Sequence, residues 1–185
     1  MADQKEVVFA GFGGQGVMTA GQLLAYTAME EGKQVIWIPS YGPEMRGGTA
    51  NCTVVVSDGR IGSPIINNPQ SACVFNRPSL DKFGASLKKD GLLLINSSLI
   101  DVTSERDDIT ELLVPANDMA MKVGNAKVTN MIMLAAYVGA TEIVGFDALK
   151  SMFTKKMGKK KDLLELNYTA LAEGRKLGQT IRAQG

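Results

Sequence analysis

The glycine-rich segment GFGGQG, residues 11–16, constrains the fold of this chain more than any other segment. It follows EVVFAGF, residues 6–12, where valine and phenylalanine favour a buried β-strand. It precedes VMTAGQLLAYTAMEE, residues 17–31, where apolar residues recur at helical spacing until Gly32 ends the pattern. The sequence therefore predicts a strand, a glycine turn and a helix in direct succession.

The glycines of this segment have the spacing of a phosphate-binding loop. Gly11, Gly13 and Gly16 match G-x-G-x-x-G in the strand-turn-helix context that the dinucleotide fingerprint requires. Such a loop directs backbone N–H groups and the positive end of a helix at an anion. An ordinary NAD site is disfavoured, because the next predicted strand, KQVIWIPS at 33–40, ends without the carboxylate that binds ribose. Phosphate or pyrophosphate binding is the main hypothesis, and a tight turn for helix packing is the alternative.

The rest of the chain predicts an α/β fold. Strand, turn, helix and strand within about 40 residues form a βαβ unit with parallel strands and a right-handed crossover. Further strands are expected over TANCTVVVS, SACVFN, GLLLINSS and TELLV, with a helix near 79–88 and mostly helix from Asn117 onward. With 185 residues and 45% hydrophobic content, we expect a single domain over 1–185. Its architecture should be a Rossmann-like, mostly parallel sheet flanked by helices, with a helical C-terminal region.

Composition excludes several kinds of chemistry. The chain has no histidine, so a Ser-His-Asp arrangement is excluded. Its two cysteines, Cys52 and Cys73, lie 21 positions apart and are too few for an iron-sulfur cluster or a disulfide framework, so we expect both to be buried. A net charge of +1 gives no general case for binding to nucleic acid or a membrane. Without a long apolar run or a signal-like start, we expect a cytoplasmic protein.

A second glycine-containing loop follows the predicted strand at 33–40. In PSYGPEMRGGTANC, Tyr41 opens a Tyr-Gly-Pro turn, and Arg46 stands directly before Gly47 and Gly48. Both loops should follow parallel strands at the same edge of the sheet, so Arg46 would lie beside the first loop and could clamp an anion. The alternative is a long exposed turn with one solvated arginine.

Taken together, GFGGQGVMTAGQLLA and SYGPEMRGGTANCTVVVSD resemble the gamma subunit, or gamma domain, of the 2-oxoacid:ferredoxin oxidoreductases. The likeness covers most of the chain and is most specific in its first 65 residues or so. It implies an enzyme that decarboxylates a 2-oxoacid on thiamine diphosphate, passes electrons through iron-sulfur clusters to ferredoxin and forms an acyl-CoA. The wording GPEMRGGTANC looks most like the subtype acting on 2-oxoglutarate or branched-chain 2-oxoacids. Our first prediction is 2-oxoglutarate, which yields succinyl-CoA and CO2.

The resemblance also implies a binding site on this chain. In the family, this lobe is implicated in holding coenzyme A (CoA) around its phosphates or its pantetheine arm. The matching residues of the first loop are Gly11, Gly13, Gly14, Gln15, Gly16, Val17 and Met18. Those of the second loop are Tyr41, Arg46, Gly47 and Gly48. Some fused pyruvate-specific relatives carry lysines where this chain has PEMRGG, which leaves Arg46 as the local charge partner. No catalytic or metal-binding residue is expected on this chain.

Partner subunits are implied for the remaining chemistry. Thiamine binding needs a Gly-Asp-Gly segment followed by a metal-binding asparagine, and both KDGLLL and SDGRIG lack the leading glycine. The resemblance places thiamine diphosphate, magnesium and iron-sulfur clusters on alpha, beta and ferredoxin-like delta subunits, with ferredoxin as electron acceptor and no cofactor bound covalently here. We expect the isolated chain to be inactive. The alternatives are a stand-alone nucleotide-binding or sensor module and the small subunit of indolepyruvate:ferredoxin oxidoreductase.

The helical half of the chain carries two weaker signals. Four apolar residues share one helix face and predict core packing, with a subunit interface as the alternative: Met131, Leu134, Ala135 and Val138. Three asparagines beside apolar helix turns are predicted either to cap helices or to face a partner subunit: Asn117, Asn125 and Asn130.

Overall fold

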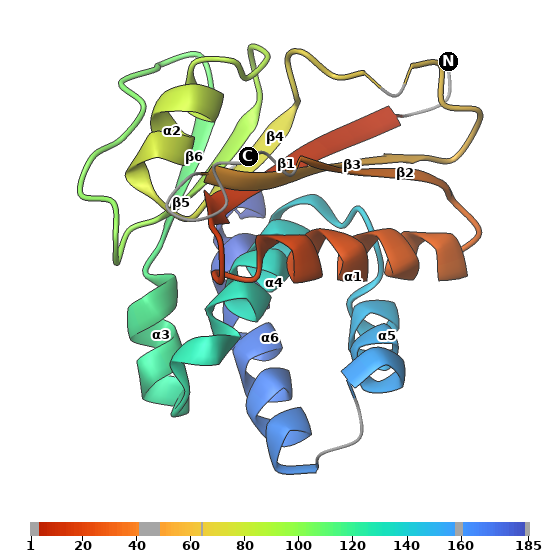
Figure 1. The fold of residues 1–185 in the computed structure, drawn as a ribbon, viewed down its shortest axis with the longest axis vertical. Coiled ribbons are helices and arrows are strands. Elements are labelled where there is room, and N and C mark those ends of the chain that lie inside the picture. Colours follow the sequence, from red (N-terminus) through yellow and green to blue (C-terminus); the bar gives the residue numbers. More distant parts are fainter. Residues whose placement is uncertain (1–3, 41–48, 64, 158–160, 184–185) are drawn as a thin grey trace.

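The computed structural model describes residues 4–40, 49–63, 65–157 and 161–183. Its centre is one six-stranded sheet in the order β2-β3-β1-β4-β5-β6 (Figure 1). The strands are β1 (Gln4–Phe12), β2 (Gln34–Ser40), β3 (Thr49–Ser57), β4 (Ser71–Val74), β5 (Leu92–Asn96) and β6 (Thr110–Val114). The predicted α/β class is confirmed, and each strand expected from the sequence is present.

One strand runs against all the others. β1 pairs in parallel with β4, and β5 and β6 continue the parallel arrangement. β3 lies between β1 and β2 and is antiparallel to both, in register from Gln4 opposite Ser57 to Phe12 opposite Thr49. β1 and β2 therefore point the same way, as the βαβ prediction requires. β3 separates them, however, and this pairing was not predicted.

Helices cover the two faces of the sheet unequally. Figure 1 shows α1, α4, α5 and α6 on one face and α2 on the other. The helices are α1 (Val17–Glu30), α2 (Arg77–Gly84), α3 (Ala116–Val123), α4 (Thr129–Thr141), α5 (Phe146–Met157) and α6 (Lys161–Arg182), with a 3-10 turn, η2 (Ala126–Val128), before α4. The predicted apolar face of α4 is confirmed as core, because all four of its residues are buried. None of the helices in the described ranges is both long and apolar enough to cross a membrane.

The helix predicted near 79–88 is displaced towards the N-terminus. α2 begins at Arg77, because the side chain of Asn76 accepts a hydrogen bond from the backbone N–H of Ser79, at 2.9 Å, and a proline stands in the first turn. The helix ends at Gly84, after which a turn follows in which the N–H of Ser86 donates to the carbonyl oxygen of Phe83. The prediction was therefore wrong at both ends of this element.

The backbones of α4 and α6 approach each other without intervening side chains. A Cβ atom on Gly174 would overlap the carbonyl group of Ile132, and one on Gly178 would overlap the carbonyl group of Ala136. α4 is consequently buried along most of its length between α6 and the sheet. This packing fixes the position of the first turn of α4, which forms one wall of the candidate site.

Candidate functional site

The candidate site lies at the edge of the sheet where the parallel strands end. β1, β4 and β5 run in the same direction, so their carboxyl ends meet at this edge. The chain passes from β1 into α1 on one face of the sheet, and from β4 into α2 on the other face (Figure 1). Ligands of open α/β sheets bind outside the carboxyl ends of the strands at such a point.

The first glycine loop is braced by its own glutamine. The backbone N–H of Gln15 donates to the carbonyl oxygen of Phe12 at 3.1 Å, and the N–H of Phe12 donates to Oε1 of Gln15 at 2.6 Å. Nε2 of Gln15 also donates to the carbonyl oxygen of Phe75 at 3.4 Å. The Gln15 side chain therefore ties the loop to the residue that follows β4.

Gly16 joins the loop to α1 and also touches α4. Its φ of 75° is left-handed, and no side chain in the described part of the chain caps the amino end of α1. Nδ2 of Asn130 donates to the Gly16 carbonyl oxygen at 3.2 Å, and a Cβ on Gly16 would lie 2.5 Å from this nitrogen. Glycine is thus required both for the backbone angle and for the close approach of α4.

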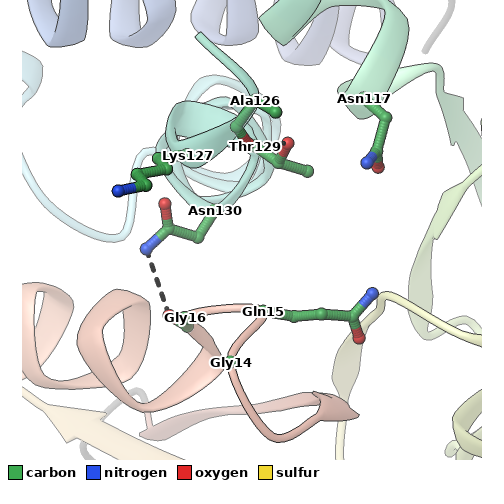
Figure 2. Close-up of a pocket in the computed structure, with 8 residues that line it drawn as sticks. All are labelled: Gly14, Gln15, Gly16, Asn117, Ala126, Lys127, Thr129 and Asn130. Atoms are coloured by element: carbon green, nitrogen blue, oxygen red, sulfur yellow. Dashed lines mark hydrogen bonds between the residues drawn. The ribbon is translucent and has the colours of Figure 1, made fainter.

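A pocket of about 390 Å³ opens between this loop and the start of α4 (Figure 2). Its volume is within the range of small-molecule sites. The lining combines the glycine loop with parts of α3, η2 and α4: Gly14, Gln15, Gly16, Asn117, Ala126, Lys127, Thr129 and Asn130. Chain segments more than 100 positions apart in the sequence thus meet at one cavity.

The pocket is polar and mostly neutral. Among the described residues that line it, Lys127 alone carries a charge, and Figure 2 shows its ammonium group turned away from Asn117. The amino end of α1 adds the partial positive charge of its first N–H groups. Asn125, just outside the lining, caps η2 by accepting a hydrogen bond from the N–H of Lys127 at 2.9 Å, which confirms one of the predicted asparagine caps.

The residues predicted for the first loop have different surroundings in the structure. Three of them line the pocket: Gly14, Gln15 and Gly16. Gly11 and Val17 are buried, Met18 is half-buried against the core, and Gly13 is exposed at the turn. A Cβ on Gly11 would lie 2.6 Å from Oε1 of Gln15 and 2.8 Å from the Cβ of Phe75, so Gly11 allows the loop to pack closely against the residue that follows β4. The residues of the second loop lie outside the described residues: Tyr41, Arg46, Gly47 and Gly48.

Sequence reasoning missed most of the opposite wall. It named Asn117 and Asn130 only as caps or partner contacts, and it did not name Ala126, Lys127 or Thr129. The local signal for these residues is weak, because an alanine, a lysine and a threonine are ordinary residues at helix starts. Only the packing of α4 on the sheet brings them to the glycine loop.

Both cysteines are confirmed as buried, unpaired thiols. Burial raises the pKa of the Cys52 thiol to about 11, and burial also raises the pKa of Cys73 well above its ordinary value. Both thiols are therefore protonated and unreactive near neutral pH. Within the described ranges, no three histidine, cysteine, aspartate or glutamate side chains are arranged to hold a metal ion.

The sequence matches the family described as Pyruvate ferredoxin/flavodoxin oxidoreductase over residues 6–177. It is 37% identical over 174 residues to ketoisovalerate oxidoreductase subunit VorA of Methanothermobacter marburgensis, which covers 91% of this chain and 35% of that protein. It is 33% identical over 182 residues to 2-oxoglutarate synthase subunit KorC of the same organism, covering 94% of this chain and 96% of that one. The chain thus spans about a third of the length of VorA and nearly all of KorC.

Solved structures share the fold. The gamma subunit of a keto/oxoacid ferredoxin oxidoreductase from Geobacter sulfurreducens matches with a TM-score of 0.83 and 29% identity, covering 95% of this chain and 99% of that one. The 2-oxoglutarate:ferredoxin oxidoreductase of Magnetococcus marinus, solved with 2-oxoglutarate, CoA and succinyl-CoA, matches with a TM-score of 0.87 and 20% identity. That match covers 96% of this chain and 31% of the other, and it concerns the fold alone.

Proposed function

Since the chain belongs to the pyruvate ferredoxin/flavodoxin oxidoreductase family, we propose that it is the gamma subunit of a 2-oxoacid:ferredoxin oxidoreductase. The match over residues 6–177 carries this proposal, and it confirms the family resemblance of the two glycine-rich segments. The proposed reaction converts a 2-oxoacid and CoA into an acyl-CoA and CO2, and the electrons released reduce ferredoxin.

The proposed role of this chain is to complete the CoA site. The supporting observation is the pocket between the glycine loop and α4, where the amino end of α1 suits a phosphate group. The second loop would add Arg46, because it follows β2 at the same edge of the sheet. Ser40 at the end of β2 pairs with Asn51, and Phe12 at the end of β1 pairs with Thr49.

The redox and decarboxylation groups would sit on partner subunits. The chain has two cysteines, both buried, which are too few to ligate an iron-sulfur cluster, and its described residues offer no cluster of metal ligands. The proposed partners are alpha, beta and ferredoxin-like delta subunits, with ferredoxin as the electron acceptor. The gamma chain would brace these subunits and supply no catalytic side chain.

The 2-oxoacid has two candidates. The second loop resembles the subtype acting on 2-oxoglutarate or branched-chain 2-oxoacids and so suits both candidates. 2-Oxoglutarate remains the first candidate, because KorC, which is named for 2-oxoglutarate, is matched over nearly its whole length. The 37% identity to VorA favours ketoisovalerate as the second candidate. Substrate-selecting residues would lie largely on the partner subunits, so assays of the intact complex are needed to distinguish 2-oxoglutarate from ketoisovalerate.

The decisive experiment is co-expression of this chain with the subunits encoded beside it. The purified complex would be assayed for reduction of a viologen dye with 2-oxoglutarate, ketoisovalerate, pyruvate and indolepyruvate, each with and without CoA. We expect CoA-dependent reduction with 2-oxoglutarate or ketoisovalerate and none from the isolated chain. Preference for indolepyruvate would replace the proposed subtype. A chain that finds no partner and binds a nucleotide alone would be a sensor module instead.

A further inference from the structure

Asn96, the last residue of β5, is a fully buried carboxamide beside the pocket wall. Its Nδ2 donates a hydrogen bond to Oδ1 of Asn117 at 2.8 Å. Its own Oδ1 is buried and has no hydrogen-bond partner among the described residues. Because a buried polar group is costly to leave unpaired, such an asparagine needs a reason beyond packing.

The bond from Asn96 determines which end of the Asn117 carboxamide is available to a ligand. A carboxamide has one acceptor oxygen and one donor NH2 group. The oxygen of Asn117 accepts a hydrogen bond from Asn96, and this bond orients the carboxamide with its NH2 group towards the pocket. In Figure 2 the Asn117 side chain points towards the glycine loop, with its nitrogen on the side of Thr129. The pocket therefore has a donor at this end.

The chemistry of the surrounding wall indicates what this donor meets. Three carboxamides line the cavity, from Gln15, Asn117 and Asn130. Lys127 is the charged residue of the described lining, and its ammonium group points away from Asn117. Neutral donors and acceptors complement an amide group better than a phosphate, whose charge is favoured at the amino end of α1. The Asn117 end of the pocket therefore suits an amide group, and the α1 end suits a phosphate group.

We propose that Asn96 is a positioning residue that fixes Asn117 as a hydrogen-bond donor to an amide carbonyl oxygen of the ligand. This inference rests on the proposed function, in which the ligand is CoA and the amide belongs to its pantetheine arm. The phosphates then lie towards the amino end of α1. The pocket is divided into an amide end at Asn117 and a phosphate end at Gly16.

The first test replaces the donor without changing its shape. Asn117→Asp keeps an acceptor for Asn96 but presents a carboxylate to the pocket. In the assembled complex it should raise the apparent KM for CoA about tenfold while the KM for the 2-oxoacid stays unchanged. Asn125→Asp is the matched control, because it adds the same charge nearby, outside the lining, and aspartate still caps η2. It should change the KM for CoA less than twofold.

A second test shows whether Asn96 acts through Asn117. Asn96→Ala should raise the KM for CoA in the wild-type background and have no further effect on it in an Asn117→Ala background. A purely structural role would lower the stability of the complex equally in both backgrounds and would leave the KM for CoA unchanged. Additive effects of the two alanine variants on the KM for CoA would overturn the positioning role.

Inhibition by 3′,5′-ADP, which carries phosphates but no pantetheine amide, separates the two ends of the pocket. Its inhibition constant should be unchanged in Asn117→Asp, whereas a large increase would make Asn117 a phosphate ligand and overturn the amide assignment. Arg46→Ala keeps this inference distinct from the proposed function. If Arg46→Ala raises the KM for CoA and Asn117→Asp does not, the inference alone fails. If neither variant affects CoA, the proposed CoA site fails too.

Discussion

Asn130 and Gly16, which are 114 positions apart in the sequence, are joined by a hydrogen bond of 3.2 Å from the side-chain nitrogen of Asn130 to the Gly16 carbonyl oxygen. The same asparagine lies where a side chain on Gly16 would begin. The glycine loop and the first turn of α4 are therefore one structural unit. A change at either residue should affect both walls of the pocket.

This contact makes Gly16→Ala a sharp test of the site. Gly16 and Gly32 both have left-handed backbones, with φ of 75° and 79°, so alanine is strained at either position. Only Gly16 has a neighbour, the Asn130 side chain, within 4 Å of the new methyl group. Urea unfolding should show Gly16→Ala to be destabilised by roughly 1 to 3 kcal/mol more than the Gly32→Ala control. Equal losses would mean that Asn130 moves aside at no cost.

Arg46→Ala tests the predicted anion clamp of the second loop. Loss of a charge-assisted hydrogen bond worth roughly 1.5 to 3 kcal/mol should raise the apparent KM for CoA about tenfold or more in the complex. The increase should be smaller at high salt, because screening already weakens the pair. Arg60→Ala, in the loop that follows β3 at the opposite edge of the sheet, is the control. A parallel rise in the KM for the 2-oxoacid would indicate a packing role for Arg46.

Gly13→Val tests the turn itself. Gly13 is exposed at the tip of the loop, so a valine there adds bulk where a ligand would approach the backbone. We expect a higher apparent KM for CoA in the complex, a smaller change in the KM for the 2-oxoacid, and little loss in the unfolding free energy of the chain. A variant that loses stability but keeps its KM for CoA would assign Gly13 to folding alone.

The buried thiols predict how stability varies with pH. The pKa of Cys52 is raised to about 11, so the folded chain keeps a proton that the unfolded chain loses above its ordinary value of 9.0. The unfolded state then binds fewer protons, and the free energy of unfolding must fall as pH rises from about 9 to about 11, by up to roughly 3 kcal/mol from this group. The raised pKa values of Cys73 and Tyr137 act in the same direction.

Urea unfolding at several alkaline pH values measures this decrease in the unfolding free energy. In Cys52→Ala, the decrease of the unfolding free energy with pH should be smaller by the contribution of Cys52. This comparison does not depend on how the variant changes stability at neutral pH. A thiol reagent should label neither cysteine of the native chain and both in denaturant. Fast labelling of the native chain would contradict the burial that raises the pKa values of both thiols.

Local sequence patterns predicted the wall of the pocket that the glycine loop forms. Glycine spacing and helical periodicity placed α1 within one residue of its observed end at Glu30, and Gly14, Gln15 and Gly16 do line the pocket. The position of β3 between β1 and β2 could not be predicted in the same way. It depends on which strands pair, and strand pairing is decided by contacts far apart in the sequence.

The opposite wall of the pocket depends on the same kind of long-range packing. Asn117 and Asn130 stand at helix starts, where asparagine ordinarily caps. In the structure their side chains instead bond to Asn96 and Gly16, which lie on other elements. The sequence around Asn117 and Asn130 does not indicate these distant partners. The residue type alone therefore favoured the prediction that both asparagines cap helices.

The packing of α6 on α4 is therefore expected to control the site from a distance. In a helix, glycine to alanine normally adds roughly 0.5 to 1 kcal/mol of stability. At Gly178 the sign should reverse, because the new methyl group would overlap the carbonyl of Ala136 on α4. We expect Gly178→Ala to lower the unfolding free energy by about 1 to 3 kcal/mol, whereas Thr169→Ala, at an exposed position of α6, stays within about 0.5 kcal/mol. In the complex, Gly178→Ala should also raise the KM for CoA, since a displaced α4 carries Asn130 away from Gly16. A stabilised Gly178→Ala chain would show that the two helices do not pack this closely.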